Sequence, residues 1–234
     1  TVLAFGNNKG GVGKSSTASN TALMLSSLGY KTLLIDSDGQ ANATSFFVSP
    51  ETEAFCIVEI LMKQKSLEDA IINLTGTLSI LPSNLYNQSL PKILSDKPRN
   101  TLKNLISPLL TKFDYIIWDC NPSLDITNQQ IYYSCTDVFI VTLMEAWSLQ
   151  GVEMTRDTLL SCFEDSTVKY PNVHVLINKL DNRIGSQINL YSKLESLKLQ
   201  IYPVTVETDN NIPKSQNEGF LLTNKNKTFR SYLD

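Results

Sequence analysis

The sequence predicts an α/β fold, in which a mostly parallel central sheet carries helices on both faces. Apolar runs of strand length recur along the chain, and segments with helical periodicity separate them. The apolar runs are continuous rather than alternating, which is typical of parallel strands that are buried on both sides. A glycine-rich segment also lies between the first predicted strand and the first predicted helix. Together these features predict helices layered above and below a sheet.

Length and composition fit a single domain. With 234 residues, 42% of them hydrophobic and 18% charged, the chain can bury a substantial core and is not expected to be disordered. No Gly/Ser-rich, Pro-rich or single-charge run marks a linker, so we expect one domain over residues 1–234. No stretch reaches about 18 apolar residues and no signal-peptide pattern opens the chain, so we expect a cytoplasmic protein.

Strands and helices alternate along the chain. Predicted strands cover residues 2–5, 32–35, 78–81, 115–118, 138–143, 173–177 and 201–204. Predicted helices cover residues 15–28, 57–63, 101–112, 149–163 and 188–197. The first helix has Ala18, Ala22 and Leu25 at helical spacing, and Gly29 behind it is a typical stop. Strand, glycine loop and helix therefore follow one another in the order that a phosphate site requires.

The cysteines argue against a metal site or a disulfide framework. Cys56, Cys120, Cys135 and Cys162 are far apart and form no C-x-x-C pair, and the single histidine, His174, sits in an apolar run. A reductase that holds an iron–sulfur cluster between subunits needs paired cysteines, so that class is disfavoured as well.

The glycine-rich segment, residues 9–15 with the sequence KGGVGKS, has the parts of a phosphate loop. Gly10, Gly11 and Gly13 allow backbone N–H groups to turn toward a polyphosphate at close range. The helix that starts near Ser15 adds unpaired N–H groups and the positive end of its dipole. Lys14 can reach the β- and γ-phosphates, and the Ser15 hydroxyl can ligate Mg²⁺.

The strict pattern G-x-x-x-x-G-K-[ST] fails at one place, because its first glycine falls on Asn8, and a second lysine, Lys9, stands beside the loop. K-G-G-V-G-K-S resembles the deviant Walker A motif of the ParA/MinD family of ATPases. That resemblance implies a P-loop NTPase fold with ATP and Mg²⁺ as cofactors. It also implies that the nucleotide phosphates contact Lys9, Gly10, Gly11, Val12, Gly13, Lys14, Ser15 and Ser16.

Residues 36–44, with the sequence DSDGQANAT, resemble the D-x-D-P-Q-x-N-x-T segment of the same family. A carboxylate at the carboxyl edge of a parallel sheet faces the ligand crevice, where it can orient an attacking water or hold the water shell of a metal ion. By match to the motif, Asp38 is assigned to hydrolysis and Asp36 to the metal. Gly39 replaces the proline of the family, which is expected to loosen this switch loop. The alternative is a solvated turn rich in Asp, Gly and Asn.

Residues 114–123, with the sequence DYIIWDCNPS, resemble the Walker B strand and the loop behind it. The apolar run ends in Asp119, which would bind Mg²⁺ through water or beside Ser15. Family members usually have Thr-Pro where this chain has Cys120 and Asn121, so the shape of the second switch loop is open. An aspartate that ends a strand is in the alternative only a turn former.

Base recognition is assigned to two segments further along the chain. Asn178 follows the predicted strand 173–177 and matches the position at which family members often contact adenine. The loop of residues 206–219, which includes Pro213, resembles the segment that closes over the base. In the alternative, Asn178 is a loop residue kept for backbone reasons.

Lys9 resembles the signature lysine of the family, which crosses to the nucleotide of the second subunit. The resemblance implies that ATP joins a face-to-face homodimer and that slow hydrolysis releases it. Catalysis is thus assigned to Lys9, Lys14 and Asp38. In the alternative, Lys9 solvates the loop or contacts the phosphate of its own subunit.

The charge distribution bears on the partner. The net charge is −3 and the pI is near 5.3, which does not indicate a general nucleic-acid binder. Residues 1–182 hold 13 basic and 18 acidic side chains, a balance of −5, whereas residues 183–234 hold 7 and 5, a balance of +2. We therefore expect a weakly basic face near the C-terminus, with a mixed solvated surface as the alternative.

The family acts on two main surfaces, which are non-specific DNA for ParA proteins and anionic membrane for MinD. Residues 225–234 hold too little apolar surface for an anchor, so we expect DNA as the partner rather than membrane. The alternative is MinD-like positioning on membrane or on a protein cargo. Candidate DNA contacts, chosen by charge and position, are Arg183, Lys193, Lys198, Lys214, Lys225, Lys227 and Arg230.

The DNA interpretation implies a role in plasmid or chromosome partitioning, with nucleoid association in the ATP-bound state. It also implies a ParB-like centromere-binding partner that stimulates hydrolysis. The chain begins almost at its first strand, so we expect no helix-turn-helix of its own and no operator-specific binding.

Overall fold

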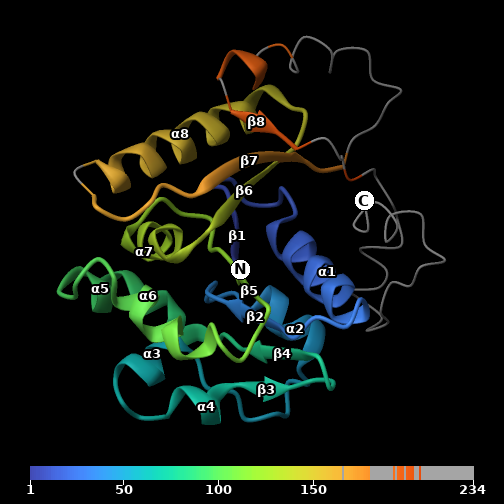
Figure 1. Cartoon of the computed structure of the whole chain (residues 1–234), viewed down its shortest axis with the longest axis vertical. Coiled ribbons are helices and arrows are strands. Elements are labelled where there is room, and N and C mark those ends of the chain that lie inside the picture. Colours follow the sequence, from blue (N-terminus) through green and yellow to red (C-terminus); the bar gives the residue numbers. More distant parts are fainter. Residues whose placement is uncertain (165, 180–191, 193, 198, 203–205, 207–234) are drawn as a thin grey trace.

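The computed structural model describes the chain except for residues 165, 180–191, 193, 198, 203–205 and 207–234, which Figure 1 draws as a thin grey trace. The side chains of residues 146 and 147 are also not described. The predicted base contact Pro213 lies outside the described residues, as does half of the predicted helix 188–197. The same holds for every predicted DNA contact, namely Arg183, Lys193, Lys198, Lys214, Lys225, Lys227 and Arg230.

The centre of the fold is an eight-stranded sheet in the order β3-β4-β2-β5-β1-β6-β7-β8. Its strands are β1 (Val2–Gly6), β2 (Thr32–Asp36), β3 (Ile72–Asn73), β4 (Leu78–Leu81), β5 (Tyr115–Asp119), β6 (Asp137–Thr142), β7 (Asn172–Ile177) and β8 (Gln200–Ile201). Neighbouring strands pair in parallel, except for β3 and β4, which are antiparallel. The predicted mostly parallel sheet is therefore confirmed.

Helices cover both faces of this sheet (Figure 1). They are α1 (Lys14–Ser27), α2 (Asn42–Phe47), α3 (Ile57–Leu61), α4 (Leu67–Ala70), α5 (Leu90–Ser95), α6 (Thr101–Ile106), α7 (Ile126–Ser134) and α8 (Ala146–Phe163). Successive side chains of a strand point to opposite faces, so each strand feeds two cores. In β2, Leu33 and Ile35 belong to the core under α3, α5, α6, α7 and α8, whereas Leu34 belongs to the core under α1 and α2.

The structure corrects several predicted elements. The helix predicted over residues 101–112 ends as α6 at Ile106 and continues as the 3₁₀ turn η2 (Ser107–Leu109), because Pro108 has no N–H to continue the helical pattern. Sequence analysis missed α7, whose buried residues Thr127, Asn128 and Gln130 are polar and give no apolar periodicity. It also missed the two-residue edge strand β3 and the short helices α2, α4 and α5.

Three predicted strands run one residue further than expected, and these residues matter for the site. β1 ends at Gly6, β2 at Asp36 and β5 at Asp119. Since the strands are parallel and adjacent, their carboxyl ends open on one edge of the sheet. Within the described residues, no helix is both long enough and apolar enough to cross a membrane.

Candidate functional site

The loops behind β1, β2 and β5 meet at the carboxyl edge of the sheet. In the sheet register Asp119 is the partner of Asp36 on one side and of Phe5 on the other. The phosphate loop leaves β1 directly after Gly6, and the two aspartates end the neighbouring strands. Three motifs that lie far apart in the sequence are thus brought together by strand order alone.

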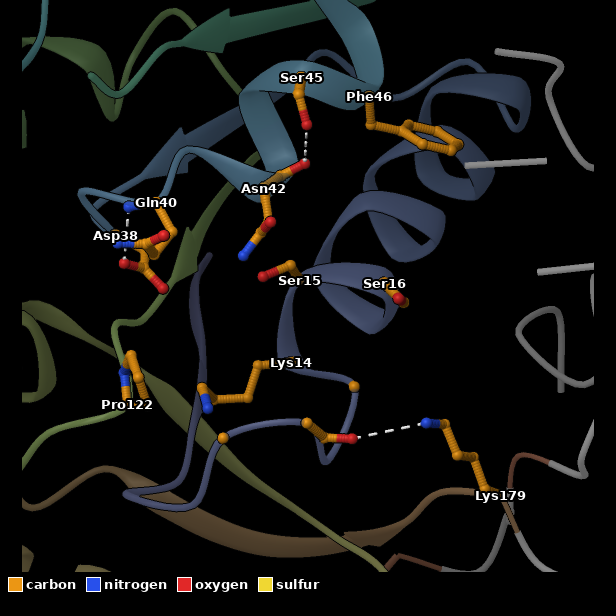
Figure 2. A pocket seen from close by; sticks show the side chains of 13 residues that line it. Lys14, Ser15, Ser16, Asp38, Gln40, Asn42, Ser45, Phe46, Pro122 and Lys179 are labelled. Atoms are coloured by element: carbon orange, nitrogen blue, oxygen red, sulfur yellow. Dashed lines mark hydrogen bonds between the residues drawn. The ribbon is translucent and has the colours of Figure 1, made fainter. Parts of the chain in front are cut away.

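A cavity of about 470 Å³ opens over this edge. Figure 2 shows Lys14, Asp38 and Pro122 on one side of it, Ser15 and Ser16 at the start of α1, and Phe46 and Lys179 on the other side. Its lining residues are Gly10, Gly11, Gly13, Lys14, Ser15, Ser16, Asp38, Gln40, Asn42, Ser45, Phe46, Pro122 and Lys179. Of the predicted phosphate contacts, Lys9 and Val12 do not line this cavity.

The phosphate loop has the backbone shape that its glycines permit. Gly11 and Gly13 have φ values of 76° and 96°, a region that residues with a Cβ rarely adopt. Gly13 is the N-cap of α1 and makes no side-chain cap hydrogen bond. The first turn of α1 therefore presents backbone N–H groups and a positive dipole end at the cavity, which together favour an anion.

Lys14 is buried at the centre of the loop. Its Nζ donates to the carbonyl oxygen of Lys9 at 2.9 Å. Burial lowers the pKa of Lys14 below its ordinary value, and the nearby carboxylates of Asp119 and Asp38 oppose that shift. A buried cation between carboxylates and a donor-rich loop is placed to neutralise an incoming anion.

Asp36 is fully buried and is committed to the loop that follows it. One carboxylate oxygen accepts bonds from the backbone N–H and the hydroxyl of Thr44, both at 2.8 Å, and the other accepts from the N–H of Asp38 at 3.0 Å. Burial raises the pKa of Asp36 to about 6, against the effect of these hydrogen bonds. Asp36 therefore organises the switch loop from within.

Asp119 is buried without such support. Neither carboxylate oxygen has a close hydrogen-bond partner among the described residues, although the Ser15 hydroxyl lies near enough to lower its pKa. Burial raises the pKa of Asp119 well above its usual range, and the charge of Asp36 adds to this rise. A buried carboxylate near a serine hydroxyl fits a cation such as Mg²⁺, because both groups offer oxygen ligands.

The unsupported carboxylate gives a stability prediction. Ionisation of an acid costs more in the folded chain when its pKa there is raised. Such an acid therefore destabilises the fold as the pH rises above the pKa that it has in the unfolded chain, about 3.9 for aspartate. Asp119→Asn is therefore expected to raise the free energy of unfolding of the nucleotide-free protein at pH 8 by about 1–3 kcal/mol. The gain should shrink toward pH 4, as urea unfolding at several pH values would show.

Asp125→Asn is the matched control, since Asp125 caps α7 by accepting from the N–H of Thr127 at 2.8 Å. Its loss should leave stability unchanged or lower. A nucleotide-free Asp119→Asn protein that unfolds more easily than the native chain at pH 8 would contradict this account of Asp119.

The switch loop behind Asp36 contacts the segment that contains Ser83 and Gln88. Asp38 accepts from the N–H of Gln40 through its carboxylate at 3.0 Å, and its carbonyl accepts from the Ser83 hydroxyl at 2.6 Å. A Cβ on Gly39 would press against Gln88 of the 3₁₀ turn η1 (Leu85–Ser89). Gly39 therefore lets this neighbouring turn approach the loop closely. The expectation that loss of the proline loosens the loop stays a prediction.

Lys9 turns away from the cavity toward the start of α8. Its Nζ donates to Glu145 Oε2 at 3.0 Å and to Ser148 Oγ at 2.9 Å. The Lys9 side chain is 32% exposed and that of Glu145 is 56% exposed, so this ion pair is only weakly stabilising. Sequence reasoning missed both partners, which come about 140 residues later in the chain and carry no local signal.

Asn178 lies directly behind β7, as the sequence indicated, and touches the phosphate loop. Its Nδ2 donates to the carbonyl of Val12 at 2.8 Å. The next residue, Lys179, lines the cavity and was not among the predicted site residues. The sequence shows only a basic residue directly after Asn178, and its left-handed backbone (φ 51°) becomes visible in the structure alone.

Comparison with known proteins identifies the family of this chain. A family model described as an AAA domain matches residues 1–170. The chromosome partitioning protein ParA of Myxococcus xanthus is 26% identical over 241 residues, which cover 99% of this chain and 85% of that protein. This chain therefore belongs to the family that the AAA-domain model describes. It is a ParA/MinD-type P-loop ATPase, as the deviant Walker A motif predicted.

Solved structures with the same fold differ in what they do. A plasmid partition protein of Borrelia burgdorferi bound to AMPPNP is 25% identical, with a TM-score of 0.86, and the match covers 100% of this ParA/MinD-type chain and 95% of that one. Cobyrinic acid a,c-diamide synthase of Mycobacterium smegmatis with ADP and magnesium is 22% identical, with a TM-score of 0.83 and coverage of 99% and 90%. The fold serves both proteins, so a function must be argued from the site.

Proposed function

We propose that this chain is a ParA-type partitioning ATPase that binds Mg²⁺-ATP, dimerises on it and holds non-specific DNA as the dimer. The observation that carries the nucleotide part is the fully buried carboxylate of Asp119, which lies near Ser15 and Lys14, two residues that line the cavity together with the phosphate loop. A metal-bound triphosphate requires a carboxylate and a hydroxyl at the metal ion and a lysine at the phosphates.

In this proposal the triphosphate lies over residues 10–16, with Lys14 on the β- and γ-phosphates. Ser15, Asp36 and Asp119 remain the proposed residues at Mg²⁺, directly or through water, and Asp36 also stabilises the loop around it. Bound Mg²⁺ supplies charge neutralisation of the phosphate oxygens. Asp38, which lines the cavity with its carboxylate, orients the attacking water. Asn178 and Pro213 remain the proposed contacts on the base side.

The dimer part rests on Lys9. Its present partners, Glu145 and Ser148, form an exposed ion pair and a hydroxyl contact that water can replace at little cost. Lys9 is therefore free to exchange them for the nucleotide of a second subunit, where two phosphate charges would hold it more strongly. Hydrolysis would remove that attraction and release the dimer.

The DNA part rests on relatives. The ParA protein of Myxococcus xanthus is a chromosome partitioning protein and the similar Borrelia burgdorferi structure is a plasmid partition protein. We extend that role to this chain, with a ParB-like protein that stimulates hydrolysis and with nucleoid association of the ATP-bound dimer. The basic residues from Arg183 to Arg230 that are named above remain the proposed contacts to the phosphates of DNA.

Co-sedimentation tests the choice of surface. With Mg²⁺-ATP, the protein is expected to pellet with plain duplex DNA and not with anionic liposomes, because a DNA contact draws on basic side chains and a membrane contact needs an apolar anchor. Binding to DNA should weaken steeply from 50 to 200 mM salt, by roughly tenfold or more for a few phosphate contacts. Pelleting with liposomes and not with DNA would favour MinD-like positioning instead.

Lys9→Ala should separate nucleotide binding from dimerisation. The variant is expected to keep Mg²⁺-ATP affinity within a few-fold of the native chain, since Lys9 does not line the cavity of its own subunit. It should nevertheless elute as a monomer in size-exclusion chromatography with ATP. Glu145→Gln is the matched control, because it frees Lys9 and should dimerise at equal or lower ATP concentrations. An Lys9→Ala protein that dimerises like the native chain would refute the assigned role.

A further inference from the structure

The loop behind β7 is tied to the phosphate loop by two consecutive side chains. Asn178 is buried and donates from Nδ2 to the carbonyl oxygen of Val12 at 2.8 Å. Lys179 donates from Nζ to the carbonyl oxygen of Gly11 at 3.4 Å, as Figure 2 shows. The two contacts therefore hold two successive peptide groups of the phosphate loop.

The contact is closely fitted on both sides. The Asn178 amide occupies the space that a Cβ on Gly13 would fill, so this glycine is required for the approach. Lys179 has a φ of 51°, a left-handed conformation that is uncommon for residues other than glycine. Its backbone N–H donates to Asn178 Oδ1 at 2.9 Å, which fixes both residues in this conformation.

Peptide planarity gives these contacts a consequence for anion binding. In a trans peptide the C=O and the following N–H point in opposite directions. Holding the carbonyl of Gly11 toward Lys179 therefore turns the N–H of Val12 the other way, and holding the carbonyl of Val12 does the same for the N–H of Gly13. Asn178 and Lys179 therefore orient two donors of the phosphate loop, the N–H groups of Val12 and Gly13, away from β7.

We infer that Asn178 and Lys179 form a clamp that keeps the phosphate loop in its anion-binding shape. This inference rests on the proposed nucleotide function and changes the role of one residue in it. Asn178 is a positioning residue for the phosphates, whether or not it also contacts the base. Removing it should weaken the binding of a polyphosphate that has no base at all.

The test compares Mg²⁺-ATP with inorganic tripolyphosphate by calorimetry. Asn178→Ala is expected to weaken both by a similar factor, about tenfold each, as the loss of a buried hydrogen bond implies. Asn178→Asp should behave alike, because a carboxylate cannot donate to Val12. Weakening of ATP alone would identify a base contact and overturn the clamp, and so would unchanged affinity for both ligands.

Asn172→Ala is the matched control. Asn172 begins the same strand at the opposite edge of the sheet and donates from Nδ2 to Asp137 Oδ1 at 2.9 Å, so the same kind of bond is lost far from the phosphate loop. Its ligand affinities should remain those of the native chain. Lys179→Met, which removes only the outer contact, is the milder second variant should Asn178→Ala not fold, and a loss of about threefold for both ligands is expected. Unchanged affinities in Lys179→Met would count against the clamp.

Hydrogen exchange of the nucleotide-free protein separates this inference from the proposed function. The backbone N–H groups of residues 10–14 should exchange faster in Asn178→Ala than in the native chain, while those of β6 keep their protection. Equal exchange in the phosphate loop would overturn the clamp. A native chain that fails to bind ATP would defeat the proposed function, and the clamp would then stand or fall on exchange alone.

Discussion

Replacement of Lys14 by methionine is expected to abolish tight ATP binding. Methionine keeps most of the buried stem and removes the ammonium, which lies near Asp119 and Asp38 and donates to the Lys9 carbonyl. A charge-assisted bond to a phosphate contributes about 1.5–3 kcal/mol, and Lys14 would make such bonds to two phosphates. Affinity should therefore fall at least about hundredfold, which calorimetry with Mg²⁺-ATP would measure.

Lys92→Met serves as the control, since Lys92 is exposed on α5 and does not line the cavity. It should bind ATP as the native chain does. The folded state of Lys14→Met is checked by its unfolding temperature, because the variant leaves the Lys9 carbonyl without its donor. A folded Lys14→Met protein that retained micromolar affinity would count heavily against the phosphate loop as the nucleotide site.

The parts of this site that could be predicted are those whose residues lie close together in the sequence. The glycines of residues 10–13 followed by Lys14 and Ser15 fix a loop and a helix start within a few residues, and backbone sterics leave little choice there. The order of apolar runs then indicated a parallel sheet. That sheet brings Asp36 and Asp119 to adjacent strand ends, so the carboxylates could be foreseen as neighbours.

The parts that could not be predicted depend on contacts between distant segments. Ser83 reaches the carbonyl of Asp38 across 45 residues, and Asn87 donates to the carbonyl of Asp36 across 51. Both residues sit at or near η1, whose sequence shows no periodicity. The same limit hid the partners of Lys9, because an exposed Glu and a buried Ser at the start of a helix are ordinary features by themselves.

Helix α7 shows a different limit. Asn128 donates to the carbonyls of Asn121 and Ser123 at 2.9 and 2.6 Å, so the helix holds the second switch loop through a buried amide. Four of the six buried residues of α7 are polar, Asn128 among them, so apolar periodicity does not reveal this helix. Hydrophobic periodicity does not predict a helix whose buried side chains hydrogen-bond to a loop instead of packing in an apolar core.

Asp38→Asn is expected to bind ATP normally and to hydrolyse it about 10²–10⁴-fold more slowly, the usual contribution of a positioned acid–base group. Asparagine can still accept the bond from the Gln40 N–H, and the bond from Ser83 goes to the backbone, so the loop keeps its shape. Only the negative charge that orients the water is lost. Phosphate release and size-exclusion chromatography with ATP would record slow turnover and an accumulated dimer.

Asp36→Asn provides the contrast, because the two carboxylates differ in what they hold. The backbone N–H and the hydroxyl of Thr44 both donate to Asp36, each at 2.8 Å. In Asp36→Asn an amide NH₂ group can replace the accepting oxygen, and it would then meet these donors without being able to accept from them. That variant should therefore lose affinity as well as turnover, whereas Asp38→Asn loses turnover alone. Wild-type hydrolysis in Asp38→Asn would refute its role. A slow, ATP-bound dimer would instead mean that hydrolysis times the release of the dimer, since binding and dimerisation then persist without it.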